Sequence, residues 1–140
     1  MKTSTIKDVE VIDFSKHKEK SGTLVAIEEL KNIPFELARV FYILNVPNNE
    51  VRGKHAHKKQ EQVLICVNGS CEVSVKDSHN LKRIVLDKSS QGLYIPSGIW
   101  NEITYHTNDT ILLVLTNECY DVSDYISDWS RFIELKGNAV

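Results

Sequence analysis

Several features that mark other protein classes are scarce in this chain. Only three of its 140 residues are cysteines, Cys66, Cys71 and Cys119. Their odd number and irregular spacing argue against a disulfide framework and against a zinc site. The formal net charge of -2, with both signs mixed along the chain, leaves no basic field for nucleic acid. No apolar run reaches about 18 residues, so we expect no membrane-spanning segment.

The first ten residues are polar and do not resemble a signal peptide. Together with the cysteine pattern, this predicts a cytoplasmic protein whose thiols are reduced and buried. No repeat, low-complexity tract or linker interrupts the sequence, and 140 residues suit one domain over residues 1–140.

Short alternating or β-branched segments between turn residues predict about ten strands and one helix. Asn68-Gly69 predicts a hairpin, because both residues accept positive φ. Lys16–Ser21 is charged and predicts a loop, and the tail from Ser123 predicts a short helix with Ser127 as its N-cap. The predicted strands are residues 9–14, 22–30, 37–46, 52–57, 62–67, 70–76, 81–86, 92–95, 100–106 and 110–116. This spacing favours an antiparallel sandwich or barrel, of which the jelly roll is the commonest at this size.

The segment Arg52-Gly53-Lys54-His55-Ala56-His57 is the most informative stretch of the chain. In an extended strand, alternate side chains share a face, so His55 and His57 point the same way. Imidazole exchanges protons near neutral pH and also binds metals. The pair therefore predicts either a metal site or a site of proton transfer, whereas the isolated His17, His79 and His106 are interpreted as structural.

This segment resembles the metal-binding motif of cupins, which are small jelly rolls. That motif runs His-x-His, three or four residues, Glu, six residues, Gly, whereas here Gln62 stands in the Glu place before Gly69. A second cupin motif, Pro-x-Gly, two residues, His, ends here in Asn101. Two imidazoles and two amides are a poor ligand set for a first-row metal. We therefore expect no metal, unless Glu61 rather than Gln62 faces the interior.

A larger set of motifs resembles the bacterial dTDP-4-keto-6-deoxyglucose 3,4-ketoisomerases, a WxcM-like group of cupins. The motifs are Arg-Gly-x-His-Ala-His from Arg52, Gln62, Val-Asn-Gly-Ser-Cys from Val67, Trp-x-Glu from Trp100, and Tyr-Asp-x-Ser-Asp-Tyr-Ile from Tyr120. The resemblance implies an all-β cupin-type jelly roll, a double-stranded β-helix barrel with a short C-terminal helix. It implies an isomerase without cofactor that acts in deoxyamino-sugar biosynthesis for a surface polysaccharide.

The implied reaction moves a carbonyl group from C4 to C3 of the hexose through an enediol. His55 and His57 would transfer the carbon-bound proton by general acid–base catalysis. Tyr42 falls at a tyrosine of the family's Val-Tyr-Tyr-Ile segment, and we expect its hydroxyl to serve the developing oxyanion. Phe41 departs from that segment.

The remaining expected site residues would bind the nucleotide sugar. Arg52 suits the diphosphate through its planar fork of donors, with Lys54 and Arg39 adding positive charge. Trp100 would stack on the base or sugar, and Glu102 and Gln62 would bind sugar hydroxyls or a catalytic imidazole. Each has a structural alternative: a surface ion pair for Arg52, a core position for Tyr42, and core or dimer packing for Trp100.

Three other functions fit part of the pattern. A dTDP-sugar 3,5-epimerase would use one His with a Tyr acid, a metal-dependent cupin dioxygenase would bind iron through the His pair, and a regulatory cupin would bind the nucleotide sugar without catalysis. The resemblance also implies a homodimer, in one form with strands exchanged between subunits. Apolar strands near the N-terminus agree with this, because they would leave exposed edges in a monomer.

Overall fold

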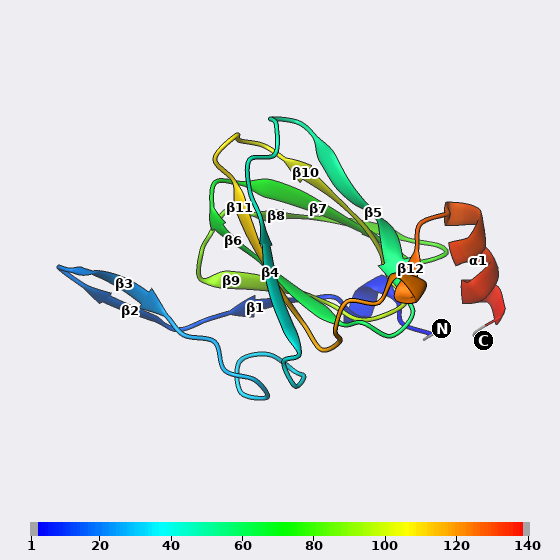
Figure 1. Ribbon diagram of the computed structural model, residues 1–140, viewed down its shortest axis with the longest axis horizontal. Helices are drawn as coiled ribbons and strands as arrows, with labels where there is room; N and C mark the ends of the chain where they lie inside the picture. The colour runs from blue at the N-terminus through cyan, green and yellow to red at the C-terminus, as the bar shows by residue number, and fades with distance from the viewer. Residues whose placement is uncertain (1–2, 139–140) are drawn as a thin grey trace.

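Two five-stranded sheets face each other in the computed structural model, which describes residues 3–138 (Figure 1). The first sheet has the order β1 (Glu10–Asp13), β9 (Gln91–Ile95), β6 (Gln62–Asn68), β11 (Ile111–Thr116) and β4 (Arg39–Ile43). The second has the order β12 (Tyr125–Ile126), β5 (Val51–His57), β10 (Trp100–Tyr105), β7 (Cys71–Lys76) and β8 (Leu81–Leu86). Neighbouring strands in both sheets are antiparallel.

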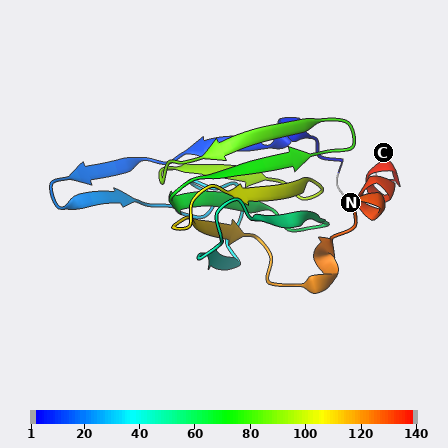
Figure 2. The ribbon, with the colours of Figure 1, turned by 90° about the horizontal axis from the view of Figure 1, so that it is seen from above.

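The space between the sheets is filled mainly by aliphatic side chains. Leu64 and Leu112 from the first sheet and Val73 and Tyr105 from the second are almost fully buried in one cluster. Alternation along the strands turns these residues inward and leaves their neighbours outside. The all-β architecture expected from the spacing of short strands is thereby present (Figure 2).

The turn at Asn68-Gly69 does not close a hairpin. β6 pairs with β9 and β11, whereas β7 pairs with β8 and β10, so the turn carries the chain from one sheet to the other. The prediction of the two strands is confirmed and that of their pairing is wrong. Five consecutive residues of β6, Gln62–Cys66, are buried, and such a strand needs partners on both edges within its own sheet.

The β2–β3 hairpin lies apart from the two sheets. β2 (Lys16–Glu19) pairs with β3 (Gly22–Val25), and the hairpin projects beyond β1 (Figure 1). The predicted loop at Lys16–Ser21 is therefore largely a strand, and the strand predicted over residues 22–30 ends at Val25. Every residue of this hairpin is exposed except Val25, which is half-buried, so no buried face produced a sequence signal.

The C-terminal segment contains a 3₁₀ turn (Val122–Asp124), β12 and then α1 (Trp129–Asn138). The helix starts later than predicted, and Asp128 rather than Ser127 is its N-cap, because the Asp128 carboxylate accepts from Ser130 N at 3.2 Å. A further 3₁₀ turn covers Ile6–Asp8 near the start of the chain. Within residues 3–138, no helix has the length and apolar character to cross a membrane.

Candidate active site

A cavity of about 210 Å³ lies between the two sheets beside β12. Its floor is apolar and includes Leu64, Ile103 and Val114. The polar lining consists of Arg52, His55, His57, Gln60, Gln62, Asn101 and Tyr125. A mostly apolar cavity with a few convergent polar groups is typical of a small-molecule site.

A β-bulge in β5 decides which residues of the histidine segment face this cavity. Asn101 pairs with His55 and Glu102 with Gly53, so Lys54 is an extra residue without its own partner. Gly53 and Lys54 both have positive φ, +89° and +59°. The extra residue reverses the alternation, which places Arg52 in the cavity with the histidines. Arg52 is also exposed, so it lies at the cavity rim.

The His55 ring has one nitrogen held by the backbone and one left free. Its Nδ1 lies 3.0 Å from the Gly53 carbonyl oxygen, to which it donates. Among residues 3–138, Nε2 of His55 has no hydrogen-bonding partner. Burial lowers the pKa of His55 below its ordinary value, with the Gly53 carbonyl opposing the shift. His55 is therefore neutral at pH 7, with an unprotonated nitrogen available as a base.

The His57 ring is held at both nitrogens. Nδ1 donates to Asp124 Oδ2 at 3.1 Å, and Nε2 accepts from the Gln60 side-chain amide at 3.3 Å. Burial and the neighbouring His55 lower the pKa of His57, and Asp124 only partly opposes them. The two histidine rings meet edge to face with centroids 4.9 Å apart. Asp124 fixes the orientation and the tautomer of His57. The His57 ring is therefore held in one position beside His55.

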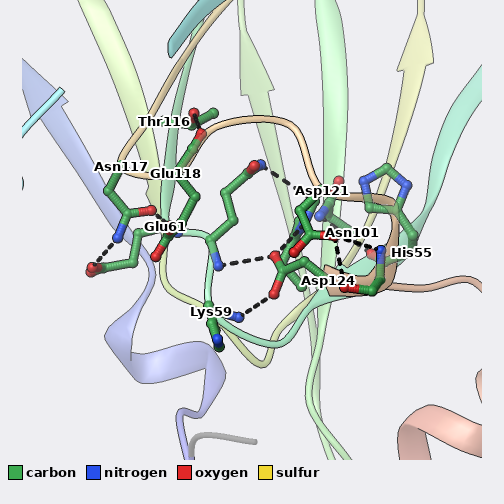
Figure 3. A network of polar contacts seen from close by, with 12 residues as sticks. His55, Lys59, Glu61, Asn101, Thr116, Asn117, Glu118, Asp121 and Asp124 are labelled. Carbon is green, nitrogen blue, oxygen red and sulfur yellow. Dashed lines mark hydrogen bonds and ion pairs between the residues drawn. The ribbon is translucent and has the colours of Figure 1, made fainter. Parts of the chain in front are cut away.

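Asp124 also anchors the residue 120–126 segment, which we call the strap, against the turn that follows β5. Its Oδ1 accepts from Lys59 N at 2.7 Å and its Oδ2 from Gln60 N at 3.1 Å (Figure 3). The next residue, Tyr125, pairs with His57 in the β5–β12 ladder. The strap thereby closes one side of the cavity and presents Tyr125 to it.

Gln62, and not Glu61, faces the cavity. The Glu61 carboxylate accepts from Asn117 Nδ2 at 3.1 Å and from the Tyr94 hydroxyl, away from the histidines (Figure 3). The sequence would favour a metal only if Glu61 faced the interior, and Glu61 does not. Two imidazoles and three amides, with His57 engaged at both nitrogens, do not fit a metal ion. Among the described residues, no three His, Cys, Asp or Glu side chains form a metal-binding group.

Five of the residues expected in the site do not line this cavity. Tyr42 is on the outer face of β4 with its side chain 64% exposed, because alternation turns Phe41 and Ile43 inward instead. Within one chain its hydroxyl therefore cannot serve the histidines. Lys54 is turned outward by the bulge. The structure therefore brings neither side chain into the cavity with the histidines.

Trp100 and Glu102 lie on the outer face of β10, under α1. Trp100 packs edge to face against Trp129, with ring centroids 5.3 Å apart, and also contacts Phe132. Glu102 accepts from Lys76 Nζ at 3.0 Å and from Trp100 Nε1 at 3.2 Å. In this chain Trp100 and Glu102 thus make contacts between the sheet and the helix, where contacts with the substrate were expected. For Trp100 this agrees with the alternative of a core position.

Arg39 lies next to the cavity without lining it. Its guanidinium stacks on the Phe41 ring, with Cζ 4.6 Å from the centroid, and lies 5.4 Å from the Tyr120 centroid. The buried Nε of Arg39 makes no hydrogen bond to any described residue. Its charge also contributes to the low pKa of His57. A ligand that extends from the cavity past Phe41 would meet this cation.

Three further residues, Gln60, Asp124 and Tyr125, belong to the site although the sequence predicted no role for them, and the contact of Asn101 with a backbone carbonyl was not predicted either. Asp124 and Tyr125 belong to the Tyr-Asp-x-Ser-Asp-Tyr motif, so the signal was present in the sequence. What the motif could not show is that these residues meet β5, since His57 and Asp124 are 67 positions apart. Asn101 donates to the His55 carbonyl oxygen at 3.4 Å (Figure 3).

Residues 7–137 match the family described as WxcM-like, C-terminal (FdtA). The chain belongs to this family. A relative in Aneurinibacillus thermoaerophilus, TDP-4-oxo-6-deoxy-alpha-D-glucose-3,4-oxoisomerase, is 46% identical over 87% of the chain and 88% of its own length. The WxcM-like family is the one that the sequence motifs indicated.

Solved structures of related enzymes share the fold. The sugar 3,4-ketoisomerase QdtA of Thermoanaerobacterium thermosaccharolyticum, in complex with TDP, has a TM-score of 0.91 at 40% identity, covering 94% of this chain and 96% of its own. The TDP-fucose-3,4-ketoisomerase WlaRA of Campylobacter jejuni has a TM-score of 0.87 at 37% identity, covering 94% and 97%. The cupin-type fold expected for a WxcM-like protein is thereby confirmed.

Proposed function

We propose that this chain is a sugar-nucleotide 3,4-ketoisomerase that converts dTDP-4-keto-6-deoxyglucose to the dTDP-3-keto-6-deoxyhexose in the cavity beside β12. The 46% identical relative carries that activity in its name, and a histidine-to-asparagine variant of QdtA was solved with TDP-4-keto-6-deoxyglucose. The observation that carries the proposal for this chain is the free Nε2 of His55 in a buried, polar cavity. The reaction needs proton transfer alone, and a neutral imidazole supplies it.

His55 is the base in this proposal. The C4 carbonyl acidifies the C3 hydrogen, His55 Nε2 removes it as a proton, and the electron pair forms the C3–C4 double bond of an enediol. The resulting imidazolium returns a proton to C4, while the carbonyl group forms at C3. His57 is not the base, because Asp124 and Gln60 occupy both of its ring nitrogens. Its role is to hold the sugar against His55 and to limit the entry of water.

The nucleotide part of the substrate lies toward the rim. Arg52 offers a bidentate fork to the diphosphate, and Arg39 adds a second cation beyond Phe41. Gln62 and Asn101 remain in the cavity as amide partners for the sugar hydroxyls. The three free cysteines agree with a reaction in the cytoplasm, where thiols stay reduced. Cys119 is exposed rather than buried as expected.

His55→Asn tests the assignment of the base. We expect turnover to fall by about 10²–10⁴-fold, because a general base is lost, while the affinity for TDP stays within about threefold. Turnover is measured by NMR of the product and affinity by calorimetry. His106→Asn is the matched control, since His106 bonds Ser70 outside the cavity. Near-normal turnover in His55→Asn would contradict the assignment.

The proposed enzyme is a homodimer in which one chain's hairpin covers its partner. The β2–β3 hairpin projects with little contact to its own barrel (Figure 1). β4 is an edge strand whose outer face exposes Val40 by 52% and Tyr42 by 64%. An open edge beside exposed apolar side chains is a site of strand pairing between chains. This arrangement supports an exchange of the hairpins between two copies.

A further inference from the structure

The interior of the barrel contains two thiols that the proposed reaction does not use. Cys66 is the last buried residue of β6 and Cys71 is the first residue of β7, with exposed fractions of 1% and 0%. Alternation along the strands turns Cys66 inward with Leu64 and Cys71 inward with Val73. Because β6 and β7 lie in opposite sheets, the two thiols face each other across the interior, with four residues of chain between them.

The two cysteine side chains contact each other through their sulfur atoms. The Cys71 thiol forms a hydrogen bond with Cys66, and Cys66 Sγ donates in turn to the Asn68 carbonyl oxygen at 3.2 Å. The bond from Cys71 lowers the pKa of Cys66 although burial opposes the shift, and the same bond together with burial raises the pKa of Cys71. Cys66 is therefore the first of the two to become a thiolate, which is the form of cysteine that reacts.

Tyr105 lies beside the two thiols and holds an unused donor. It is directly opposite Cys71 in the β7–β10 ladder and is fully buried. Among residues 3–138, its hydroxyl has no hydrogen-bonding partner. Burial raises the pKa of Tyr105, and the nearby Cys71 and Cys66 add to the shift, so the hydroxyl stays protonated. A buried donor of this kind is available to an oxygen atom that is added to a neighbouring sulfur.

We propose that Cys66 and Cys71 are a site of reversible oxidative modification, at which hydrogen peroxide closes a disulfide within the native fold. The Cys66 thiolate attacks one peroxide oxygen, the O–O bond breaks, and the other oxygen leaves as water. The resulting sulfenic acid accepts a hydrogen bond from Tyr105. The Cys71 sulfur then attacks the Cys66 sulfur, the S–O bond breaks, and a second water leaves. Two thiols lose two protons and two electrons, and one peroxide becomes two waters.

The place of the pair in the fold accounts for its access to peroxide and for the effect of the disulfide. Cys66 comes directly before two exposed residues, so local opening of the turn after β6 brings a molecule of this size to the sulfur. Cys71 pairs with Tyr105 at one end of β10, whereas His55 pairs with Asn101 at the other end. The disulfide would thus join the two sheets away from the histidines, and we expect it to raise Tm by about 5 °C.

The variant Cys119→Ser tests this inference independently of the sugar reaction, because it leaves Cys66 and Cys71 as the two cysteines of the chain. The folded variant is treated with hydrogen peroxide, unfolded, alkylated with N-ethylmaleimide and analysed by mass spectrometry. We expect a mass lower by two hydrogens, no alkylated thiol, and a peptide cross-linked between Cys66 and Cys71. Dithiothreitol should restore both thiols. Cys119→Ser/Cys71→Ala is the matched control and should form no disulfide within the chain.

Three results would overturn the inference. The first is two alkylated thiols in Cys119→Ser after a treatment that consumes the exposed Cys119 of the wild type, since that reaction shows that the oxidant is active. The second is oxidation of Cys66 to a sulfinic acid without a cross-link. The third is a cross-link that lowers Tm, because such a bond would not fit the native fold. If the double variant fails to fold, the cross-linked peptide and the Tm of Cys119→Ser still decide the outcome.

Discussion

At the scale of single residues, one carboxylate holds the base-bearing strand, the following turn and the strap together. Asp124 accepts from His57 Nδ1, Lys59 N and Gln60 N and is almost fully buried. We expect Asp124→Asn to lower the free energy of unfolding by about 1–3 kcal/mol, because an amide presents only one acceptor oxygen to these buried donors. Urea unfolding measures the change. Asp121→Asn is the control, since the Asp121 side chain is exposed and, among the described residues, bonds only Ser123. Equal losses in the two variants would contradict this account.

The buried histidine pair makes stability depend on pH. Burial lowers the folded-state pKa of His55 and His57 below their ordinary value of 6.5. Below about pH 6.5 the unfolded chain therefore binds more protons than the folded chain, and the free energy of unfolding falls on acidification. The limit is about 1.4 kcal/mol per histidine per pH unit.

Urea unfolding at pH 7.5 and pH 5.5 checks this dependence. The wild type should lose more stability between the two values than the double variant His55→Asn/His57→Asn. His17→Asn, in the exposed β2 strand, should behave as the wild type. An identical pH dependence in the double variant would refute the assignment of two neutral, buried imidazoles.

The sequence was sufficient to predict that the histidine pair and Gln62 face one site. It was not sufficient for Tyr42. The His-x-His spacing places both rings on one face in any extended strand, and a glutamine cannot be mistaken for a metal-binding glutamate. Tyr42 was assigned by analogy with a two-tyrosine segment, and the sequence does not show which of the two positions faces inward. Only the burial pattern of β4 shows that Phe41 does.

At the scale of elements, the bulge in β5 separates two cations that simple alternation would place together. It turns Arg52 into the cavity and Lys54 out of it. Gly53 allows this with φ +89°, and a Cβ there would lie 3.2 Å from the Asn101 carbonyl oxygen. We expect Gly53→Ala to cost about 1–2 kcal/mol of stability. It should also weaken TDP binding through Arg52.

Thermal unfolding and calorimetry with TDP measure the two effects of Gly53→Ala. Gly137→Ala is the control, because Gly137 is in α1 and a Cβ there meets nothing within 4 Å. It should leave TDP affinity unchanged and raise stability slightly, since alanine favours a helix. Wild-type TDP affinity in Gly53→Ala would show that the bulge does not position Arg52.

Strand positions were largely predictable because alternating or buried apolar runs mark them, as in Leu81–Leu86, which matches β8. Pairing was less predictable. Asn68-Gly69 carries the local signal of a hairpin, but β6 is buried on both faces and finds its partners in β9 and β11. Trp100 and Glu102 were misplaced for a similar reason, since nothing local shows that α1 covers the outer face of β10.

At the scale of the whole molecule, the hairpin and β4 predict the oligomeric state. Light scattering should give a wild-type mass of twice the 16.0 kDa of one chain. Val40→Lys should shift the equilibrium toward the monomer, because it places a charge in the apolar outer face of β4. Val85→Lys, at a 50% exposed position on the edge strand β8, should remain dimeric. A monomeric wild type at micromolar concentration would contradict the hairpin exchange.

The most direct test of the central claim is NMR of the reaction of purified protein with dTDP-4-keto-6-deoxyglucose in D₂O with excess chelator. The proposed mechanism predicts a 3-keto sugar and turnover unaffected by the chelator, with deuterium at C4 to the extent that the His55 imidazolium exchanges its proton with solvent before it returns one to C4. Deuterium only at C3 and C5, with the carbonyl group still at C4, would instead show a 3,5-epimerase. An absence of turnover that added iron or zinc restores would show that the histidine pair is a metal site, and would contradict the proton-transfer account.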